Sequence, residues 1–379
     1  MESLKIAFFC WESLHGERVG GLANAATHLA ETLARNHEVH FFTRGGEDRE
    51  INGVNYHFCR PSGENIVRFC ADMSRVMAEQ FREQEHGRDR FDILHFHDWH
   101  PVEAMHRLSD RATIFTYHST EYGRNGNTYG DWWEFREISG KEWYGGYIAK
   151  RVTAVSYPLK TEVMQIYNVP DWKCDAVPNG VVPQAYRSLV DPGEVKRSYG
   201  IDPGAPLILF IGRLAYQKGP DLLVSAVGLA GLEHTNARVI MAGDGDMRPS
   251  LESNASHLPV QFRGYVSDSE YIRLLNASDL VVIPSRNEPF GLVLLEAWSA
   301  EKCVVATDVG GLSVNISHEV DGLKVPVSSE GLARGIMQMM DDPESRIRFG
   351  LQGRRKVDHE FRWEPIAGTL ENTYRKVTA

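Results

Sequence analysis

The chain has 379 residues, and its 41 lysines and arginines against 51 aspartates and glutamates give it a formal net charge of −10. This length favours about two to three domains, and the acidic balance argues against a nucleic-acid or anionic-membrane surface, because either partner needs a basic face. The five cysteines are odd in number and scattered, as is typical of reduced thiols in a cytosolic protein. We expect a cytoplasmic protein, because no signal peptide precedes the first strand and no apolar run reaches transmembrane length.

Strand-like and helix-like segments alternate along the first half of the chain, which predicts a parallel sheet built from βαβ units. Helices are expected at residues 23–35 and 64–86. An irregular, aromatic and glycine-rich segment, Glu121–Trp133, follows the fifth predicted strand, and a third helix is expected after it, ending near Lys150. The strands predicted in this half are Lys5–Phe9, Glu38–Thr43, Val54–Phe58, Phe91–His97, Ala112–Tyr117, Val152–Val155 and Cys174–Val177.

A second series of the same kind follows the segment Asn179–Pro183 and the helix breakers of Ile201–Pro206, and it ends in two helices at 344–359 and 364–377. The two series predict two doubly wound, Rossmann-like α/β domains at residues 1–185 and 200–359. Such domains bind ligands at the carboxyl ends of their strands, so a central cleft between facing edges is the expected site. The strands predicted in this half are Leu207–Ile211, Arg238–Ala242, Val260–Arg263, Leu280–Ile283 and Val304–Ala306.

The stretch Pro284–Ala297 joins a buried strand to a helix and carries two carboxylates. A helix start offers backbone N–H groups and the positive end of the helix dipole to anions. Glu288 precedes this start and Glu296 lies inside the helix, so the pair would flank a bound phosphate, which indicates a nucleotide sugar. An ordinary βα unit with two solvated glutamates is the alternative. A glycosidase-type nucleophile is disfavoured for Glu288, because no matched second acid accompanies it.

Two further loops follow the first strands of the two halves. Gly20–Gly21 permits positive φ and a close approach of a phosphate to the backbone, with Arg18 as a nearby cation, although a plain turn is an equal alternative. In the second half, Arg213 and Lys218 come after a strand, where they can neutralise a diphosphate and stabilise the charge on a leaving phosphate. Simple surface solvation is the alternative for these two cations.

Histidines gather at the ends of two predicted strands of the first half. His118 would face the cleft and hydrogen-bond a sugar hydroxyl, although a lone histidine is more often structural. His95, His97 and His100 suggest a metal site, but alternate positions of a buried parallel strand usually pack in the core, so we favour no metal. The strand-end residues that we expect to bind an acceptor are Asp98, Trp99 and His100.

This set of motifs, together with Glu288-x7-Glu296, resembles the retaining glycosyltransferases of the two-domain GT-B fold, specifically family 4. The resemblance covers nearly the whole chain. It implies an enzyme that binds a nucleotide-sugar donor, needs no metal or other cofactor, and passes the acceptor's proton to the leaving phosphate. It also implies that residues 200–359 bind the nucleotide sugar and that the final helix, within 360–379, crosses back to the first domain.

The same resemblance assigns roles to individual residues. Catalytic roles fall on His118, Arg213, Lys218 and Glu288. Within the donor site, Glu296 would hold the ribose, and the region of Tyr265 would hold the base. The residues implied to bind the donor are Gly20, Gly21, Arg213, Lys218, Tyr265, Val266, Glu288, Phe290, Gly291, Leu292 and Glu296.

The first half is further similar to glycogen and starch synthases, in Arg18–Ala23, His97–His100 and Thr116–His118. Two features depart from that pattern: Arg18 replaces the usual lysine, and bacterial glycogen synthases generally lack the second carboxylate, Glu296. The leading expectation is transfer of glucose from UDP- or ADP-glucose to an α-1,4-glucan. The alternatives are a family 4 transferase for a sugar phosphate, a lipid-linked sugar or a surface polysaccharide, a nucleotide-sugar 2-epimerase, and a non-catalytic nucleotide-sugar-binding protein. The oligomeric state is left open.

Overall fold

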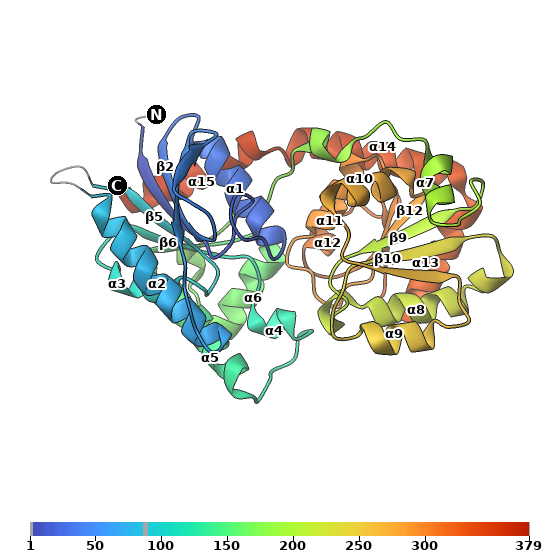
Figure 1. Ribbon diagram of the computed structural model, residues 1–379, viewed down its shortest axis with the longest axis horizontal. Helices are drawn as coiled ribbons and strands as arrows, with labels where there is room; N and C mark the ends of the chain where they lie inside the picture. Colours follow the sequence, from blue (N-terminus) through green and yellow to red (C-terminus); the bar gives the residue numbers. More distant parts are fainter. Residues whose placement is uncertain (1–2, 86–89, 379) are drawn as a thin grey trace. The chain divides into compact units, whose positions relative to one another are not determined.

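A computed structural model describes residues 3–85 and 90–378 (Figure 1). The chain divides into two compact units. Unit 1 comprises Met1–Tyr122, Thr128–Gly180 and Trp363–Ala379, and unit 2 comprises Gly123–Asn127 and Val181–Arg362. The segment left between the two predicted domains, residues 186–199, therefore lies in unit 2. The helical stretch predicted at 64–86 has its last residue outside the described part of the chain.

Unit 1 is built on one eight-stranded sheet within the described residues, ordered β3-β4-β2-β1-β5-β6-β7-β8. Neighbouring strands pair in parallel, except that β3 runs antiparallel to β4 at the edge. Because β1 lies between β2 and β5, the chain winds outward from β1 in both directions, as in a doubly wound sheet. The strands are β1 (Lys5–Phe9), β2 (Glu38–Arg44), β3 (Arg49–Ile51), β4 (Val54–Cys59), β5 (Ile93–His97), β6 (Thr113–Tyr117), β7 (Arg151–Ala154) and β8 (Cys174–Ala176).

The helices of unit 1 begin where the sequence supplies caps. Asn65 accepts a hydrogen bond from the Arg68 N–H at the start of α2, and Ser156 accepts one from the Leu159 N–H at the start of α6. The stretch Glu121–Trp133, expected to be irregular, contains the short helix α4. The helices are α1 (Gly21–Leu33), α2 (Ile66–Glu83), α3 (Val102–Arg107), α4 (Glu121–Arg124), α5 (Trp133–Ile148), α6 (Tyr157–Tyr167) and α15 (Trp363–Thr378), with a 3₁₀ turn η1 (Asp171–Lys173).

The C-terminal helix α15 packs within unit 1. His37 Nε2 lies 3.1 Å from the Glu371 carboxylate on this helix, and Lys376 Nζ lies 2.9 Å from the Asp175 carboxylate at the end of the sheet. The Tyr374 side chain of α15 is fully buried. These contacts tie the end of the chain to the strands that the first 180 residues form.

Unit 2 is built on one six-stranded sheet within its described residues, ordered β11-β10-β9-β12-β13-β14, and all neighbouring strands are parallel. The strands are β9 (Leu207–Ile211), β10 (Arg238–Ala242), β11 (Val260–Gly264), β12 (Leu280–Ile283), β13 (Val304–Thr307) and β14 (Leu323–Val325). The helices are α7 (Pro192–Ser198), α8 (Pro220–Leu229), α9 (Arg248–Asn254), α10 (Asp268–Ala277), α11 (Leu292–Ser299), α12 (Gly310–Asn315), α13 (Ser329–Asp341) and α14 (Pro343–Glu360), and the 3₁₀ turns are η2 (Pro183–Tyr186), η3 (Tyr216–Lys218) and η4 (Leu232–His234).

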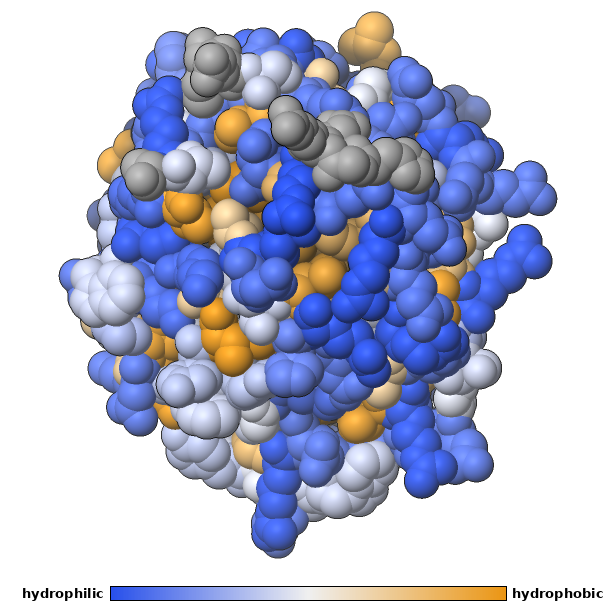
Figure 2. All heavy atoms as spheres, turned by 90° about the vertical axis from the view of Figure 1, so that its left-hand side faces the viewer, coloured by the Kyte–Doolittle hydropathy of each residue, from blue (hydrophilic) through white to orange (hydrophobic). Residues whose placement is uncertain are grey.

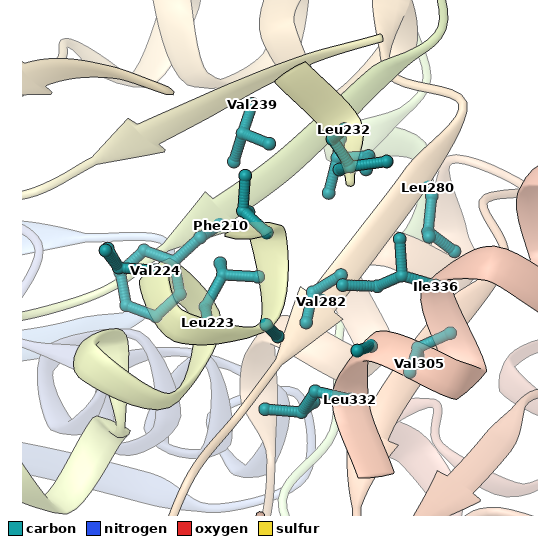
Figure 3. Packing of buried hydrophobic residues seen from close by; sticks show 14 of the residues in the cluster. Phe210, Leu223, Val224, Leu232, Val239, Leu280, Val282, Val305, Leu332 and Ile336 are labelled. Atoms are coloured by element: carbon teal, nitrogen blue, oxygen red, sulfur yellow. The ribbon is translucent and has the colours of Figure 1, made fainter. Parts of the chain in front are cut away.

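The core of unit 2 lies between the central strands and the helices α8 and α13 (Figure 3). Parallel strands buried on both faces read as continuous apolar runs, as β12 does. The apolar side chains from these strands and helices that meet in this core include Phe210, Leu223, Val224, Val239, Leu280, Val282, Val305, Leu332 and Ile336. This rigid base fixes the carboxyl ends of β9 and β12, from which the loops with the predicted donor residues leave the sheet.

The surface is largely hydrophilic where Figure 2 shows it, with hydrophobic residues in small, separate patches. Across residues 3–85 and 90–378, no helix combines the length and apolar composition that crossing a membrane requires.

Candidate active site

In unit 2, the loop between β12 and α11 holds the Glu288 side chain in a buried position. One of its carboxylate oxygens, Oε2, accepts hydrogen bonds from Lys218 Nζ at 2.7 Å and from Ser285 Oγ at 3.0 Å. The Glu288 carbonyl accepts a further bond from the Gly311 N–H at 2.7 Å. The structure thus brings together two predicted catalytic residues, Lys218 and Glu288, as an ion pair.

The Phe290–Gly291–Leu292 turn shapes the start of α11. Gly291 has φ +99°, and a Cβ at this position would lie 2.9 Å from the Leu312 side chain, so both backbone conformation and space favour glycine. Asn315 Nδ2 donates to the Phe290 carbonyl at 3.0 Å and fixes the turn. The N-cap residue of α11 is Gly291, and no side chain within residues 3–85 and 90–378 caps this helix. The positive end of this helix dipole therefore points at the loop that carries Glu288.

The two predicted cations lie on the segment that follows β9. Arg213 donates to Gln217 Oε1 at 3.2 Å, and Lys218 ends the 3₁₀ turn η3. Gly219 follows with φ +61°, and a Cβ there would lie 2.1 Å from the Pro284 carbonyl oxygen. Only glycine permits this close approach, which brings η3 against the β12–α11 loop and Lys218 within reach of Glu288.

A neighbouring set of contacts clamps the same loop. The Arg286 guanidinium binds Asp221 through both nitrogens, at 2.8 and 2.6 Å, and lies 3.9 Å from the centre of the Tyr216 ring. Asn287 Nδ2 donates to Asn127 Oδ1 at 2.7 Å. Asn127 comes from the short segment 123–127, which belongs to unit 2 although both flanks lie in unit 1. The sequence offered no signal for this clamp, because its partners are far apart along the chain.

The second carboxylate, Glu296, is buried in α11 and is bound by two tyrosines. The Tyr271 hydroxyl donates to Glu296 Oε2 at 2.6 Å, and the Tyr186 hydroxyl donates to Oε1 at 3.1 Å. Sequence reasoning singled out neither tyrosine. The two predicted base-binding residues follow β11, where the Tyr265 side chain is 82% exposed and Val266 is buried.

In unit 1, the Gly20–Gly21 loop is held by a carboxylate that the sequence analysis missed. Glu12 is almost completely buried, and its Oε2 accepts the N–H groups of Val19 at 2.5 Å and Gly20 at 2.8 Å. Burial raises the pKa of the Glu12 carboxyl, although the two amides and Arg44 act in the opposite direction. A phosphate that binds these amides must therefore compete with Glu12. The helix α1 begins at Gly21, and none of the described side chains caps it.

His118 lies at the end of β6 and is held from two sides. Its backbone N–H donates to Asp98 Oδ1 at 2.7 Å, and its Nε2 lies 3.0 Å from His97 Nδ1. Burial lowers the pKa of His118 to about 3. The imidazole is therefore neutral in the physiological range, where it can exchange hydrogen bonds with a hydroxyl but cannot supply positive charge.

The three residues predicted to bind an acceptor are buried in unit 1. Asp98 has φ +58° and holds His118. The ring of His100 stacks between Trp11, with centroids 4.1 Å apart, and Trp99, at 4.3 Å. Their binding of an acceptor stays a prediction.

The histidines of β5 are engaged in packing. His95 Nδ1 lies 2.9 Å from the Tyr374 hydroxyl, and its Nε2 lies 2.5 Å from Thr116 Oγ1. In the part of the chain that the structure describes, no group of three or more histidine, cysteine, aspartate or glutamate side chains is arranged to hold a metal ion.

The protein consists of two doubly wound units, and unit 2 carries a lysine–glutamate pair beside the start of α11. This is the architecture of a nucleotide-sugar-dependent glycosyltransferase. Residues 192–356 match the family described as glycosyl transferases group 1, and residues 19–185 match glycosyltransferase family 4. The chain is 36% identical to an uncharacterized glycosyltransferase of Methanocaldococcus jannaschii, over 98% of each protein. The chain belongs to this family, whose members use nucleotide sugars and retain the configuration of the transferred sugar.

Two further comparisons define the relationship. The chain is 26% identical to glycogen synthase of Mycobacterium tuberculosis, over 94% of this chain and 91% of that protein. The fold is similar to that of sucrose-phosphate synthase from Thermosynechococcus elongatus, with a TM-score of 0.81 and 22% identity over 99% of each chain. The predicted family and the predicted GT-B fold are confirmed. The roles assigned to individual residues stay predictions.

Proposed function

We propose that this glycosyltransferase moves glucose from UDP-glucose or ADP-glucose to an α-1,4-glucan. The similarity to a glycogen synthase over nearly the full length of both chains supports this choice of sugar and acceptor. The motifs Arg18–Ala23, His97–His100 and Thr116–His118 support it independently, since they are the ones that resemble glycogen and starch synthases.

The observation that carries the transfer chemistry of this proposal is the contact between Lys218 and Glu288, 2.7 Å long, in the loop that precedes α11. As the bond between the anomeric carbon and the diphosphate breaks, its electron pair goes to the phosphate oxygen. Lys218 and Arg213 stabilise the negative charge that develops there. The acceptor hydroxyl bonds to the anomeric carbon on the same face, and its proton passes to the leaving phosphate. This route needs no metal ion, because the two side chains supply the positive charge.

The remaining assignments follow the chemistry of each side chain. Glu288 accepts hydrogen bonds from sugar hydroxyls, and Glu296 accepts those of the ribose. The exposed ring of Tyr265, together with the backbone of Val266, contacts the base, and the neutral imidazole of His118 binds a sugar hydroxyl near the reacting carbon. The backbone of Phe290, Gly291 and Leu292 holds sugar and phosphate, and the backbone of Gly20 and Gly21 adds further donors. Asp98, Trp99 and His100 belong to the acceptor side.

The test is transfer of labelled glucose from UDP-glucose and from ADP-glucose to glycogen. We expect label in the polymer with one of the two donors and only trace label when Glu288 is replaced by alanine, a loss of well over tenfold. A thermal-shift screen with UDP, ADP, GDP and their sugars identifies the base, because a ligand that binds only the folded state raises the melting temperature.

Other outcomes would overturn the glucan assignment in distinct ways. Transfer to a sugar phosphate, a lipid-linked sugar or a surface polysaccharide, with none to glycogen, would make the enzyme a family 4 transferase with another acceptor. Release of nucleotide and an epimerised sugar without any acceptor would indicate a 2-epimerase. Calorimetric binding of the donor without turnover on any glycan would indicate a nucleotide-sugar-binding protein.

A further inference from the structure

The two tyrosines on Glu296 bind different oxygens of the same carboxylate. Tyr271 donates to Oε2 at 2.6 Å and Tyr186 to Oε1 at 3.1 Å. Their rings meet edge to face, with centroids 6.3 Å apart and an interplanar angle of 69°. Hydrogen bonds to an ionised acceptor are roughly twice as strong as neutral ones. The pair therefore defines both the position of the carboxylate and the plane in which it lies.

Both tyrosines are anchored by the same helix, α10. Tyr271 stands in its first turn, where Ser267 caps the helix by accepting the Glu270 N–H at 3.2 Å. Tyr186 ends the turn η2, and its carbonyl accepts a hydrogen bond from Asn276 Nδ2 of α10 at 2.8 Å. Helix α10 thus fixes the positions of both tyrosines within unit 2.

This support matters because of how a glutamate binds a diol. The terminal torsion of glutamate is broad and soft, so an unsupported carboxylate would turn freely and meet two neighbouring hydroxyls poorly. A carboxylate has about four lone-pair positions, so the hydrogen bonds from the two tyrosines do not by themselves fill it. Fixing its plane in advance lowers the entropy that is lost when the diol binds.

We propose that Tyr271 and Tyr186 are positioning residues that orient Glu296 toward the 2′ and 3′ hydroxyls of the donor ribose, and that they thereby make the enzyme select ribonucleotide over deoxyribonucleotide sugars. This inference rests on the proposed role of Glu296 in the donor site. Burial of its hydroxyl, followed by the charge of Glu296, raises the pKa of Tyr271 well above its usual value. The hydroxyl is therefore protonated at neutral pH and can donate to Glu296.

The test compares a ribonucleotide sugar with its 2′-deoxy form, UDP-glucose with 2′-deoxy-UDP-glucose or the ADP pair, in the wild type and in Tyr271→Phe. The wild type should prefer the ribo donor in kcat/KM, mainly through KM. Tyr271→Phe should reduce that preference by up to about tenfold, the value of a hydrogen bond to a charged group, because the deoxy donor has no 2′ hydroxyl to lose and its kcat/KM should fall less than that of the ribo donor. Tyr186→Phe should act in the same direction with a smaller effect, because its bond is longer, and it provides the second variant if Tyr271→Phe does not fold.

Tyr199→Phe is the matched control. The Tyr199 hydroxyl binds the carboxylate of Glu270, the residue next to Tyr271 in sequence, at 2.5 Å. Its removal deletes the same kind of bond from the same helix and should leave the ribo-to-deoxy ratio unchanged. Melting temperatures of all variants report any general loss of stability.

The outcomes separate this inference from the proposed function. If the wild type does not distinguish the two donors and Glu296→Gln changes nothing, Glu296 does not hold the ribose and the proposed donor site is wrong in that part. A second outcome is that the wild type discriminates between the donors, that Glu296→Gln abolishes this discrimination, and that Tyr271→Phe retains it in full. This outcome would overturn the positioning role of Tyr271 and leave the proposed donor site intact. Equal losses with both donors in Tyr271→Phe would show a purely structural tyrosine and would also overturn it.

Discussion

The strands β5 and β12 occupy equivalent places in the two units, each next to the first strand of its series and at the point where the winding reverses. They differ in composition. β12 is Leu-Val-Val-Ile, whereas β5 is Ile-Leu-His-Phe-His, and all residues of both are buried. Unit 2 therefore has an apolar strand there and carries its charged groups on the loop beyond it. Unit 1 brings polar groups into the sheet itself.

This difference has an electrostatic consequence. Burial lowers the pKa of His95 to about 3 and lowers that of His97 well below its usual value, and the pKa of His118 beside them is lowered to about 3. The described strands of unit 2 contain no histidine. The His118 imidazole of unit 1 is therefore neutral and fixed, but the buried histidines around it make unit 1 less stable in acid. Unit 2 has its ion pair on the loop and no histidine in its described strands, so we expect its core to tolerate acid.

The largest expected effect is a difference in acid stability between the units. Each of the three histidines has a pKa in the folded state below its value of about 6.5 in the unfolded state. As the pH falls, these histidines are therefore protonated in the unfolded chain but remain neutral in the folded chain. These three histidines alone should then lower the free energy of unfolding of unit 1 by up to about 4 kcal/mol per pH unit between pH 6 and pH 4, at about 1.4 kcal/mol for each. His57 of β4, whose pKa is lowered to about 4 mainly by burial, acts in the same direction. Hydrogen exchange of the whole chain, followed by mass spectrometry, should show unit 1 losing protection at a higher pH than unit 2.

The variant His95→Asn serves as the control for this prediction, because it removes one of the three groups. It should reduce the slope of the free energy of unfolding of unit 1 against pH by about 1.4 kcal/mol per pH unit, whatever its effect on stability at neutral pH. Loss of protection in unit 2 first, or in both units at one pH, would contradict the comparison.

The next effect concerns the charged loop of unit 2. Lys218→Ala removes the cation from the Glu288 carboxylate and from the leaving phosphate, and we expect kcat/KM to fall by about 100- to 1,000-fold, as when one group that stabilises transition-state charge is lost. Steady-state kinetics with the preferred donor measure it. Lys160→Ala is the control, because Lys160 forms a 2.7 Å ion pair with Asp171 in unit 1 that has no assigned role in the reaction. Similar rates for Lys218→Ala and the wild type would remove Lys218 from the mechanism.

A smaller effect is expected for the imidazole of unit 1. His118→Asn should lower kcat by about tenfold, the value of a lost hydrogen bond to substrate, without changing the shape of the pH–rate profile between pH 5.5 and 8. The reason is that a group with a pKa of about 3 does not titrate in this range. A wild-type profile with an inflection near pH 6.5 that disappears in His118→Asn would show a histidine that titrates during catalysis.

The fold was largely predictable because its signals are local. Buried strands such as Leu207–Ile211 and Leu280–Ile283 are continuous apolar runs, and the structure has both at the predicted bounds. The strands β3 and β14 have three residues each, which give only a weak periodic signal, and both were missed. The equally short β8 was predicted within Cys174–Val177. The motif around Glu288 was found because its glycine and carboxylates are close together in sequence.

The partners of these residues were not predictable in the same way. Tyr186 meets Glu296 across 110 positions of the chain, and only the packing of η2, α10 and α11 brings them together. Glu12 stands in a polar loop without periodicity, and nothing local shows that it folds back onto Val19 and Gly20. Long-range polar contacts of this kind depend on the completed fold, whereas the motif residues can be recognised from the sequence alone.

The smallest expected effect is a change in melting temperature, and it concerns Glu12, one of the two carboxylates that follow a central strand. Glu288 is held by a lysine, whereas Glu12 is held mainly by backbone amides. Because burial raises the folded pKa of Glu12, its charged form costs stability above the unfolded pKa. Glu12→Gln should therefore raise the melting temperature by about 2 °C at pH 7.5, and the gain should shrink as the pH falls and the wild-type carboxyl takes up its proton. Glu85→Gln provides a control of opposite sign: hydrogen bonds from Arg111 lower the pKa of Glu85, so this variant should melt lower than the wild type at pH 7.5, by an amount that also shrinks in acid. A lower melting temperature for Glu12→Gln at pH 7.5 would show that the amides and Arg44 outweigh the burial of the charge, and the two carboxylates would then be equally well compensated.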